Sequence, residues 1–218
     1  WQRTTGRPLA PAIVWQDRRT AARCEELRHL AWADRIGEQT GLVLDPYFSA
    51  TKIEWMIQHV PGLREKLQQG EVLFGTLDSW LLARLTGLAA TDPTNASRTM
   101  LFDLRRRCWD QELCGLFGVP VMALPEVRPS LSIFATTRKE LLGAEAPVAG
   151  VLGDQQAALF GQAGFEVGEV KVTWGTGAFL LLNTGPQPTP SPHGLISTLA
   201  YTDYHHAWYA LEGSVFVA

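Results

Sequence analysis

One stretch of the chain, residues 148–185, constrains the fold more than any other. The apolar run 148–153 is short and flanked by glycines, which predicts a buried strand, and residues 156–162 have helical composition. Asp154 stands at the junction, where ligands commonly bind in open α/β sheets. Asp is also a preferred helix N-cap ahead of a run such as Gln-Gln-Ala-Ala. The side chain is therefore a candidate catalytic base or cap, and it could serve both purposes in different states.

The same stretch continues with two runs of β-type residues, 169–174 and 178–183, separated by Gly175, Thr176 and Gly177. Glycines permit the positive φ that tight turns need, so the two runs predict a β-hairpin. Such a turn leaves backbone N–H groups and the Thr176 hydroxyl uncovered, a nest suited to phosphate oxygens. An ordinary hairpin and a phosphate-binding turn both fit this pattern.

Composition excludes several function classes. The 218 residues suggest one or two domains, and 46% hydrophobic residues supply ample material for a core. A net charge of −3 without a long basic block argues against a dominant nucleic-acid role. The three cysteines form no Cys-x-x-C pair, so neither a disulfide framework nor a zinc site is predicted, and buried thiols in a reducing cytoplasm are the simplest account. No apolar run approaches membrane-spanning length.

Before this stretch, residues 12–15 predict a short buried strand and residues 17–36 a single amphipathic helix. The expected apolar side of that helix is made of four residues, Ala22, Leu27, Leu30 and Ala31. Trp15 stands at the end of the expected strand, where a Trp is usually part of the core. The alternative is that Trp15 forms a flat apolar wall for a small polyol.

Tyr47 precedes a predicted helix that continues to residue 57, so its hydroxyl could reach a cleft or bond the backbone instead. Further helices are predicted at 63–69, 76–85 and 109–118, and further strands at 72–74, 195–200 and 206–211. His205 and His206 are adjacent, so in a strand they would face opposite sides, which argues against joint metal binding. The alternation of helices and strands predicts α/β architecture, with a domain boundary near residue 147.

The chain begins without Met and ends in a new apolar run, so we expect it to be part of a longer protein. Several motifs, in the same order along the chain, resemble the glycerol kinases of the FGGY family of carbohydrate kinases. They are residues 12–20, 45–52, 74–81, 91–102, 124–127, 153–162 and 174–179.

The resemblance implies a ribonuclease-H-like, actin-like ATPase fold, with residues 1–147 ending a first domain and residues 148–218 beginning a second. It implies transfer of the γ-phosphoryl of ATP, with Mg²⁺, to the terminal hydroxyl of glycerol. Asp154 would be the base, Gln155 and Tyr47 would hydrogen-bond glycerol, and Trp15 and Phe179 would wall its pocket. Gly175 and Thr176 would contact the nucleotide phosphates. No metal ligand is expected within the chain.

In this family the phosphate loop, the Asp associated with Mg²⁺ and an Arg-Glu pair for glycerol precede the region that resembles this chain. We therefore expect no kinase activity from the chain alone, and expect the full-length protein to be a cytoplasmic homo-oligomer. Two alternatives remain open. A pentulose or other sugar kinase of the family would share the fold and Asp154, and a non-catalytic actin-like module would bind nucleotide or sugar without transfer.

Overall fold

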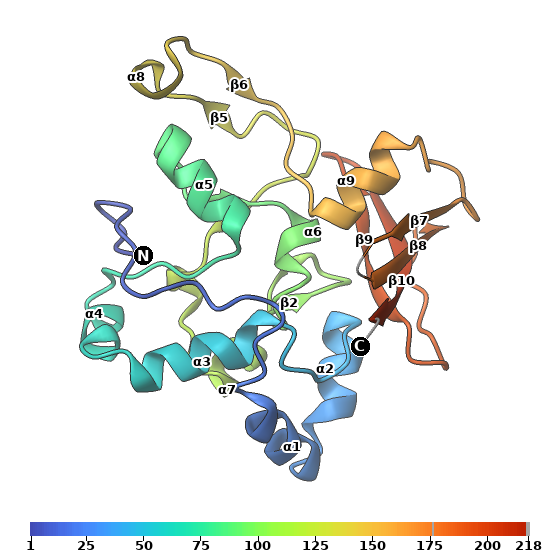
Figure 1. Cartoon of the computed structure of the whole chain (residues 1–218), viewed down its shortest axis with the longest axis horizontal. Coiled ribbons are helices and arrows are strands. Elements are labelled where there is room, and N and C mark those ends of the chain that lie inside the picture. The colour runs from blue at the N-terminus through green and yellow to red at the C-terminus, as the bar shows by residue number, and fades with distance from the viewer. Residues whose placement is uncertain (176, 217–218) are drawn as a thin grey trace.

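The structure is a computed structural model that describes residues 1–175 and 177–216. Helices dominate the chain as far as residue 161, and the four long strands between residues 170 and 216 form one antiparallel sheet (Figure 1). The helices are α1 (Ala21–His29), α2 (Trp32–Thr40), α3 (Ser49–His59), α4 (Leu63–Gln68), α5 (Leu77–Thr86), α6 (Pro93–Ala96), α7 (Gln111–Leu116), the 3-10 helix η1 (Val121–Ala123), α8 (Lys139–Leu142) and α9 (Asp154–Gly161). The strands are β1 (Ala90–Thr91), β2 (Phe102–Asp103), β3 (Cys108–Trp109), β4 (Glu126–Val127), β5 (Ala135–Thr136), β6 (Pro147–Val148), β7 (Val170–Trp174), β8 (Gly177–Gly185), β9 (Ile196–Thr202) and β10 (Ala207–Phe216).

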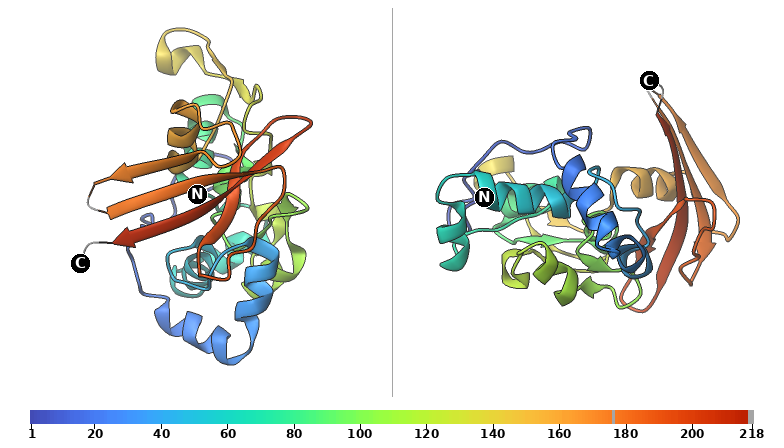
Figure 2. Two further views of the ribbon diagram at one scale, coloured as in Figure 1. Left: turned by 90° about the vertical axis from the view of Figure 1, so that its right-hand side faces the viewer. Right: turned by 90° about the horizontal axis from the view of Figure 1, so that it is seen from below.

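The main sheet has the order β7-β8-β10-β9, and all of its neighbouring strands are antiparallel. The sheet stands at one side of the molecule, and α9 lies on the face turned toward the helices (Figures 1 and 2). Leu159 of α9 packs there with Leu181 of β8 and Ala210 of β10. The predicted hairpin is confirmed, since Trp174 pairs with Ala178 across the turn. The predicted strands near 195–200 and 206–211 are also confirmed, as β9 and β10.

The helical part has its own larger core, to which α1, α2, α3, α4 and α7 all contribute. Helices α3, α4 and α5 lie where the sequence predicts them, and α7 covers the middle of the helix expected at 109–118. The single helix predicted at residues 17–36 is wrong. The chain turns at Ala31, whose φ is 60°, and a second helix starts at Trp32.

The break at Ala31 changes which side chains face the core. Cys24 and Leu27, three positions apart on α1, are buried, and Ile36 of α2 packs in the same core. Leu30, expected on the apolar side, is 59% exposed. Helix α2 therefore turns a different set of side chains toward the core and does not continue the apolar side of α1.

Three predicted strands are wrong in whole or in part. Residues 12–15 are irregular, and Val72 forms only an isolated bridge with Gln2. Of the strand expected at 148–153, only β6 forms, and it pairs with β5. The rest is an irregular connection that is exposed at residues 149 and 150 and becomes buried only at Gly153, and within it the Val151 N–H donates to the Ser130 carbonyl at 3.0 Å.

A buried carboxylate joins the helical part to α9. Asp92 is fully buried at the start of α6, where it accepts the backbone N–H groups of Thr94 and Asn95. The Ser130 hydroxyl also donates to Asp92, at 2.6 Å. The Thr94 hydroxyl donates to Asp92 at 2.9 Å and accepts the Gly153 N–H at 2.8 Å. The polar segment 91–99 is thus buried packing, and it fixes the point at which α9 begins.

Candidate active site

Asp154 is the first residue of α9 and its side chain is exposed. The N-cap of this helix is Gly153, and no side chain forms a capping hydrogen bond, so the interpretation of Asp154 as a cap is wrong. A carboxylate in the first turn is still favoured by the helix dipole. The Gln155 amide donates to the Asp154 carboxylate through Nε2, with 3.3 Å between Nε2 and Oδ2. Asp154 is thus an accessible acceptor on a fixed piece of backbone.

A buried lysine lies beneath this pair. Lys171 of β7 is 1% exposed, and its ammonium group donates to Oε1 of Gln155. Burial lowers the pKa of Lys171, while the carboxylates of Asp154 and Glu212 act in the opposite direction. Lys171 therefore sits between a helix that carries a predicted base and a second, buried carboxylate.

Glu212 of β10 binds Arg98 through two hydrogen bonds, of 2.7 and 2.9 Å. The side chains are 3% and 17% exposed, so this is a largely buried ion pair between residues 114 positions apart. Burial opposes the charge on Arg98, but Glu212 and Tyr47 outweigh it, and the pKa of Arg98 is raised. The pair connects the helical part of the chain to the sheet.

The Arg98 guanidinium also lies over the ring of Tyr47, 5.5 Å from its centroid, where a cation and an aromatic face attract. Tyr47 in turn contacts Trp15, with ring centroids 5.5 Å apart. Lys52 is 5% exposed and ties the two loops together, because it donates to the carbonyls of Val14 and Tyr47 at 2.7 and 3.2 Å. Trp15 itself is 45% exposed, so the expectation that it belongs to the core is wrong.

The register of the sheet places Phe179 on the same face as this cluster. Leu181 of β8 pairs with Lys171 on one side and Glu212 on the other, and residues directly opposite each other point to the same face. Phe179 is two residues from Leu181 and therefore shares that face, toward α9. A Cβ on Gly177 would lie 3.3 Å from the Phe179 ring, so the ring packs over the end of the turn.

The described part of the turn is closed by a hydrogen bond from the Gly175 N–H to the Gly177 carbonyl, at 2.9 Å. Thr176, the predicted phosphate contact, lies outside the described residues. The roles of Gly175 and Thr176 therefore stay predictions.

Four of the predicted residues lie along one path of contacts and charge interactions. Trp15 touches Tyr47, and at the other end Gln155 touches Asp154. The residues between the two ends were not predicted. Arg98 lies over Tyr47 and bonds Glu212, Lys171 bonds Gln155, and Glu212 and Lys171 share one row of the sheet and interact through their charges. A single charge inside an apolar strand, as at Lys171 and Glu212, is the sequence signal that could have found two of them.

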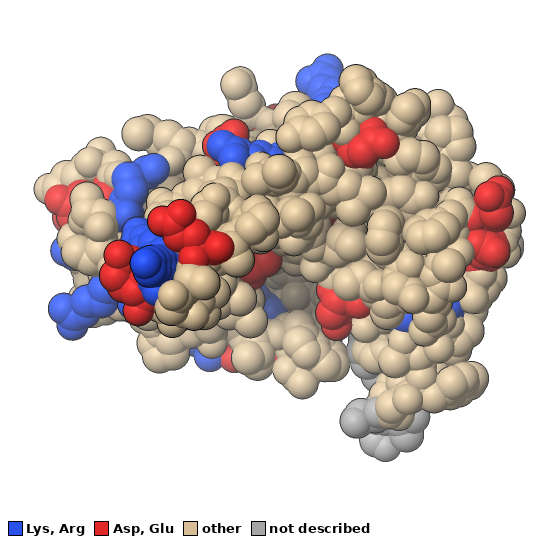
Figure 3. Space-filling view, turned by 90° about the horizontal axis from the view of Figure 1, so that it is seen from above, with Lys and Arg blue, Asp and Glu red and all other residues tan. Residues whose placement is uncertain are grey.

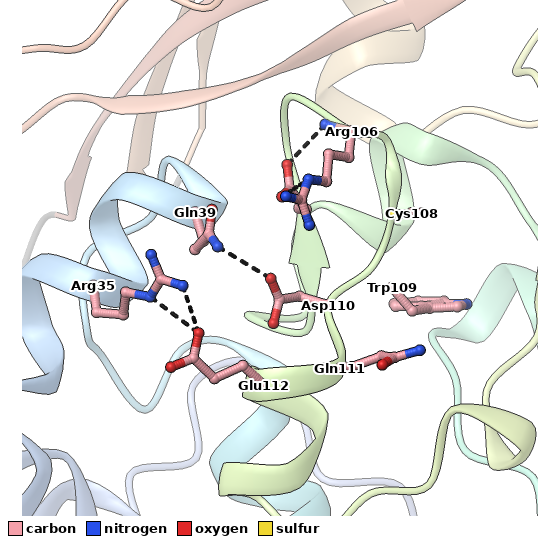
Figure 4. Close-up of a pocket in the computed structure, with 9 residues that line it drawn as sticks. Arg35, Gln39, Arg106, Cys108, Trp109, Asp110, Gln111 and Glu112 are labelled. Atoms are coloured by element: carbon pink, nitrogen blue, oxygen red, sulfur yellow. Dashed lines mark hydrogen bonds and ion pairs between the residues drawn. The ribbon is translucent and has the colours of Figure 1, made fainter.

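A cavity of about 460 Å³ lies elsewhere, between α2 and α7 (Figure 4). Four of its five charged residues form ion pairs, Arg35 with Glu112 and Arg106 with Asp103, and Asp110 accepts a hydrogen bond from Gln39. None of its lining residues is a predicted site residue. In the described part of the chain, no group of three or more His, Cys, Asp or Glu side chains could hold a metal ion.

Acidic and basic side chains are interspersed on the face of the molecule shown in Figure 3. No helix within residues 1–175 and 177–216 is long and apolar enough to span a membrane. His205 and His206 lie in a turn before β10 and not within a strand, so the strand-based argument about them does not apply.

Comparisons with known proteins identify the family. The profile described as "FGGY family of carbohydrate kinases, N-terminal domain" matches residues 1–161. A glycerol kinase of Thermus brockianus is 60% identical over 220 residues, and one of Alcanivorax borkumensis is 54% identical. Each match covers 100% of this chain and 44% of the relative, so the chain spans less than half the length of the curated relatives it matches.

Solved structures agree with this result. The structure of Plasmodium falciparum glycerol kinase with ADP is 40% identical, with a TM-score of 0.95, and the match covers 99% of this chain and 44% of that one. A xylulose kinase of Lactobacillus acidophilus shares the fold at 20% identity, with a TM-score of 0.82 over 95% of this chain and 42% of that one. The expected actin-like fold class is confirmed by these neighbours. The chain belongs to the FGGY family of carbohydrate kinases.

Proposed function

We propose that a full-length enzyme containing this chain transfers the γ-phosphoryl group of ATP to glycerol, producing sn-glycerol 3-phosphate. The observation that carries the proposal is the Asp154 carboxylate, exposed at the start of α9 and not used as a helix cap. The similarity to glycerol kinases over the whole chain supports glycerol as the acceptor. ATP as the donor is supported by the glycerol kinase structure with ADP.

In this proposal Asp154 takes the proton of the attacking hydroxyl as its oxygen bonds to the γ-phosphorus, while the bond from that phosphorus to the bridging oxygen breaks and ADP leaves. Phosphoryl transfer depends mostly on positioning and charge stabilisation, so a fixed acceptor next to the hydroxyl is what the reaction needs. Gln155 and Tyr47 hydrogen-bond the other glycerol hydroxyls, and Trp15 and Phe179 cover its carbon chain. The backbone and hydroxyl of Gly175 and Thr176 contact the nucleotide phosphates.

Mg²⁺ neutralises phosphate charge in such reactions. The described residues offer no cluster of ligands for it, so we propose that its protein ligand lies outside this chain. We also propose a cytoplasmic homo-oligomer. The cytoplasmic location is supported by the three cysteines of this chain, which are free thiols, as is typical of proteins in a reducing compartment.

The test is the ATP-dependent phosphorylation of glycerol by the full-length enzyme and by its Asp154→Asn variant, with xylulose as a competing substrate. We expect glycerol to be used and the variant to lose about 10²–10⁴ in kcat, the usual effect of removing a general base. Asp34→Asn is the matched control, because Asp34 is also an exposed acid in the first turn of a helix. Use of xylulose alone would keep the fold and overturn the substrate, and use of neither would favour a binding module.

A further inference from the structure

Lys171 is a buried cation on β7 that the reaction as described above does not use. Its position follows from the sheet register, since Lys171, Leu181 and Glu212 form one row across β7, β8 and β10. That row points toward α9, because Leu181 packs against Leu159. Lys171 therefore projects from the sheet toward the start of the helix that carries Asp154.

The contact made by Lys171 decides how the amide of Gln155 is oriented. An amide side chain can turn over by 180° without a change of shape, so only its hydrogen-bond partners decide which end faces the site. An ammonium group has three donors and no acceptor. Lys171 donates to Gln155, so the oxygen Oε1 must face the lysine and the NH₂ group must face away from it. In the structure Nε2 points to the Asp154 carboxylate.

A fixed negative charge also acts on the lysine. Glu212 lies in the same row of the sheet and attracts Lys171, and Arg98 fixes Glu212 through two hydrogen bonds. A lysine placed among buried, mutually bonded groups has little freedom to choose another partner. The orientation of the Gln155 amide is thus set by buried groups on the sheet, Lys171 and Glu212, which we place outside the substrate contacts.

We propose that Lys171 is a positioning residue, which fixes Gln155 so that its NH₂ group faces the substrate and selects an alcohol whose hydroxyl accepts that hydrogen bond. The inference rests on the proposed function. A site that presents a fixed donor discriminates against an analogue lacking the matching hydroxyl, because the hydrogen bond to that hydroxyl is then lost. Without Lys171 the amide can turn over and present its oxygen instead, and the discrimination weakens.

The experiment measures kcat and KM of the full-length enzyme for glycerol, propane-1,2-diol and propane-1,3-diol, the two diols each lacking one hydroxyl. For Lys171→Met we expect KM for glycerol to rise about 10-fold, the effect of one hydrogen bond, with kcat changed less than about 3-fold. For one of the diols kcat/KM should stay within about 3-fold of the wild-type value, so the preference for glycerol over that diol shrinks. Lys139→Met, at an exposed lysine, is the control and should change neither KM for glycerol nor the preference for glycerol over the diols.

A merely structural lysine would lower activity toward all three alcohols in parallel, and that result would overturn the proposal. A second test compares the single variant Gln155→Ala with the double variant that carries both Lys171→Met and Gln155→Ala. If Lys171 acts through Gln155, kcat/KM of the double variant for glycerol should match that of Gln155→Ala within about 2-fold. If the two residues act independently, the losses caused by the two substitutions should add in free energy.

Gln155→Glu covers the case in which Lys171→Met does not fold. It keeps a partner for Lys171 but removes the NH₂ donor, so it too should lose preference for glycerol, and wild-type discrimination in this variant would refute the idea. Failure of the proposed function is a separate outcome, since wild-type enzyme would then not phosphorylate glycerol, or Asp154→Asn would retain full activity.

Discussion

The buried ion pair between Arg98 and Glu212 gives the most direct test of how this chain is held together. The change Glu212→Gln keeps the shape of the side chain and removes its charge. In the wild-type chain both oxygens of Glu212 accept hydrogen bonds from the Arg98 guanidinium, at 2.7 and 2.9 Å. Glutamine has only one oxygen, so one of these bonds is lost and an NH₂ group faces a guanidinium N–H instead. Arg98 and Lys171 both lose the carboxylate that compensates them.

The size of the effect follows from burial. Glu212 is 3% exposed and Arg98 is 17% exposed, so water cannot replace the lost partner. Removing one member of a buried pair costs about 3–5 kcal/mol. For a chain of this length each kcal/mol shifts Tm by about 2–4 °C, so we expect Glu212→Gln to lower Tm by about 6–20 °C.

The assay is thermal unfolding of the 218-residue chain, followed by circular dichroism. The matched control is Glu126→Gln, because Glu126 also pairs with an arginine, Arg128, but the side chains are 55% and 31% exposed. Exposed pairs contribute about 0.2–1 kcal/mol, so Tm of the control should fall by no more than about 4 °C. Equal melting of the two variants would refute the reasoning. A further variant, Arg98→Met with Glu212→Leu, should recover part of the loss, since it removes both buried charges.

Three other predictions concern single residues. Burial raises the pKa of Asp92 despite the hydrogen bonds it accepts, so folding favours its protonated form. The stability of the wild-type chain should therefore fall, relative to Asp92→Asn, as pH rises from about 3.9 through the raised pKa, measured as urea midpoints across that range. Gly41→Ala should lower the free energy of unfolding by about 1–3 kcal/mol in urea titrations, because Gly41 has φ +72° and a Cβ would lie 2.3 Å from the Ser197 carbonyl oxygen. A thiol reagent at pH 8 should label exposed Cys108 first in a mass-spectrometric time course, because burial raises the pKa of the other two thiols to about 11 and about 12, at Cys24 and Cys114.

Local patterns predicted the elements whose structure is decided locally. The hairpin between β7 and β8 follows from two β-type runs around Gly175 and Gly177. Helix α3 follows from its apolar spacing, which places Ile53 and Ile57 in the core. The helix break was not predictable in this way, because Ala31 adopts a left-handed conformation that an Ala gives no reason to expect.

The residues of the candidate site also fall into two groups, those found from local motifs and those that depend on long-range pairing. Asp154, Gln155, Tyr47 and Trp15 came from motifs that resemble a family, and the structure links them through contacts and through the attraction between Lys171 and Glu212. The linking residues depend on pairing between distant segments, as with Arg98 and Glu212, so no short window of sequence contains the information. A strong charge in an otherwise apolar strand is only a weak local sign of such a partner.

The strand β7 shows how a local rule can point in the wrong direction. In Val170-Lys-Val-Thr-Trp174, alternation would place the apolar residues inside and Lys171 in water. The structure has the opposite arrangement, with Val170 50%, Val172 38% and Trp174 83% exposed while Lys171 is 1% exposed. Register explains the inversion, because pairing with Leu181 commits Lys171 to the α9 face, where Gln155 and two carboxylates compensate its charge. A slip of one residue would bury the apolar side chains and remove the cation from the site, so the register of this edge strand determines the chemistry as well as the fold.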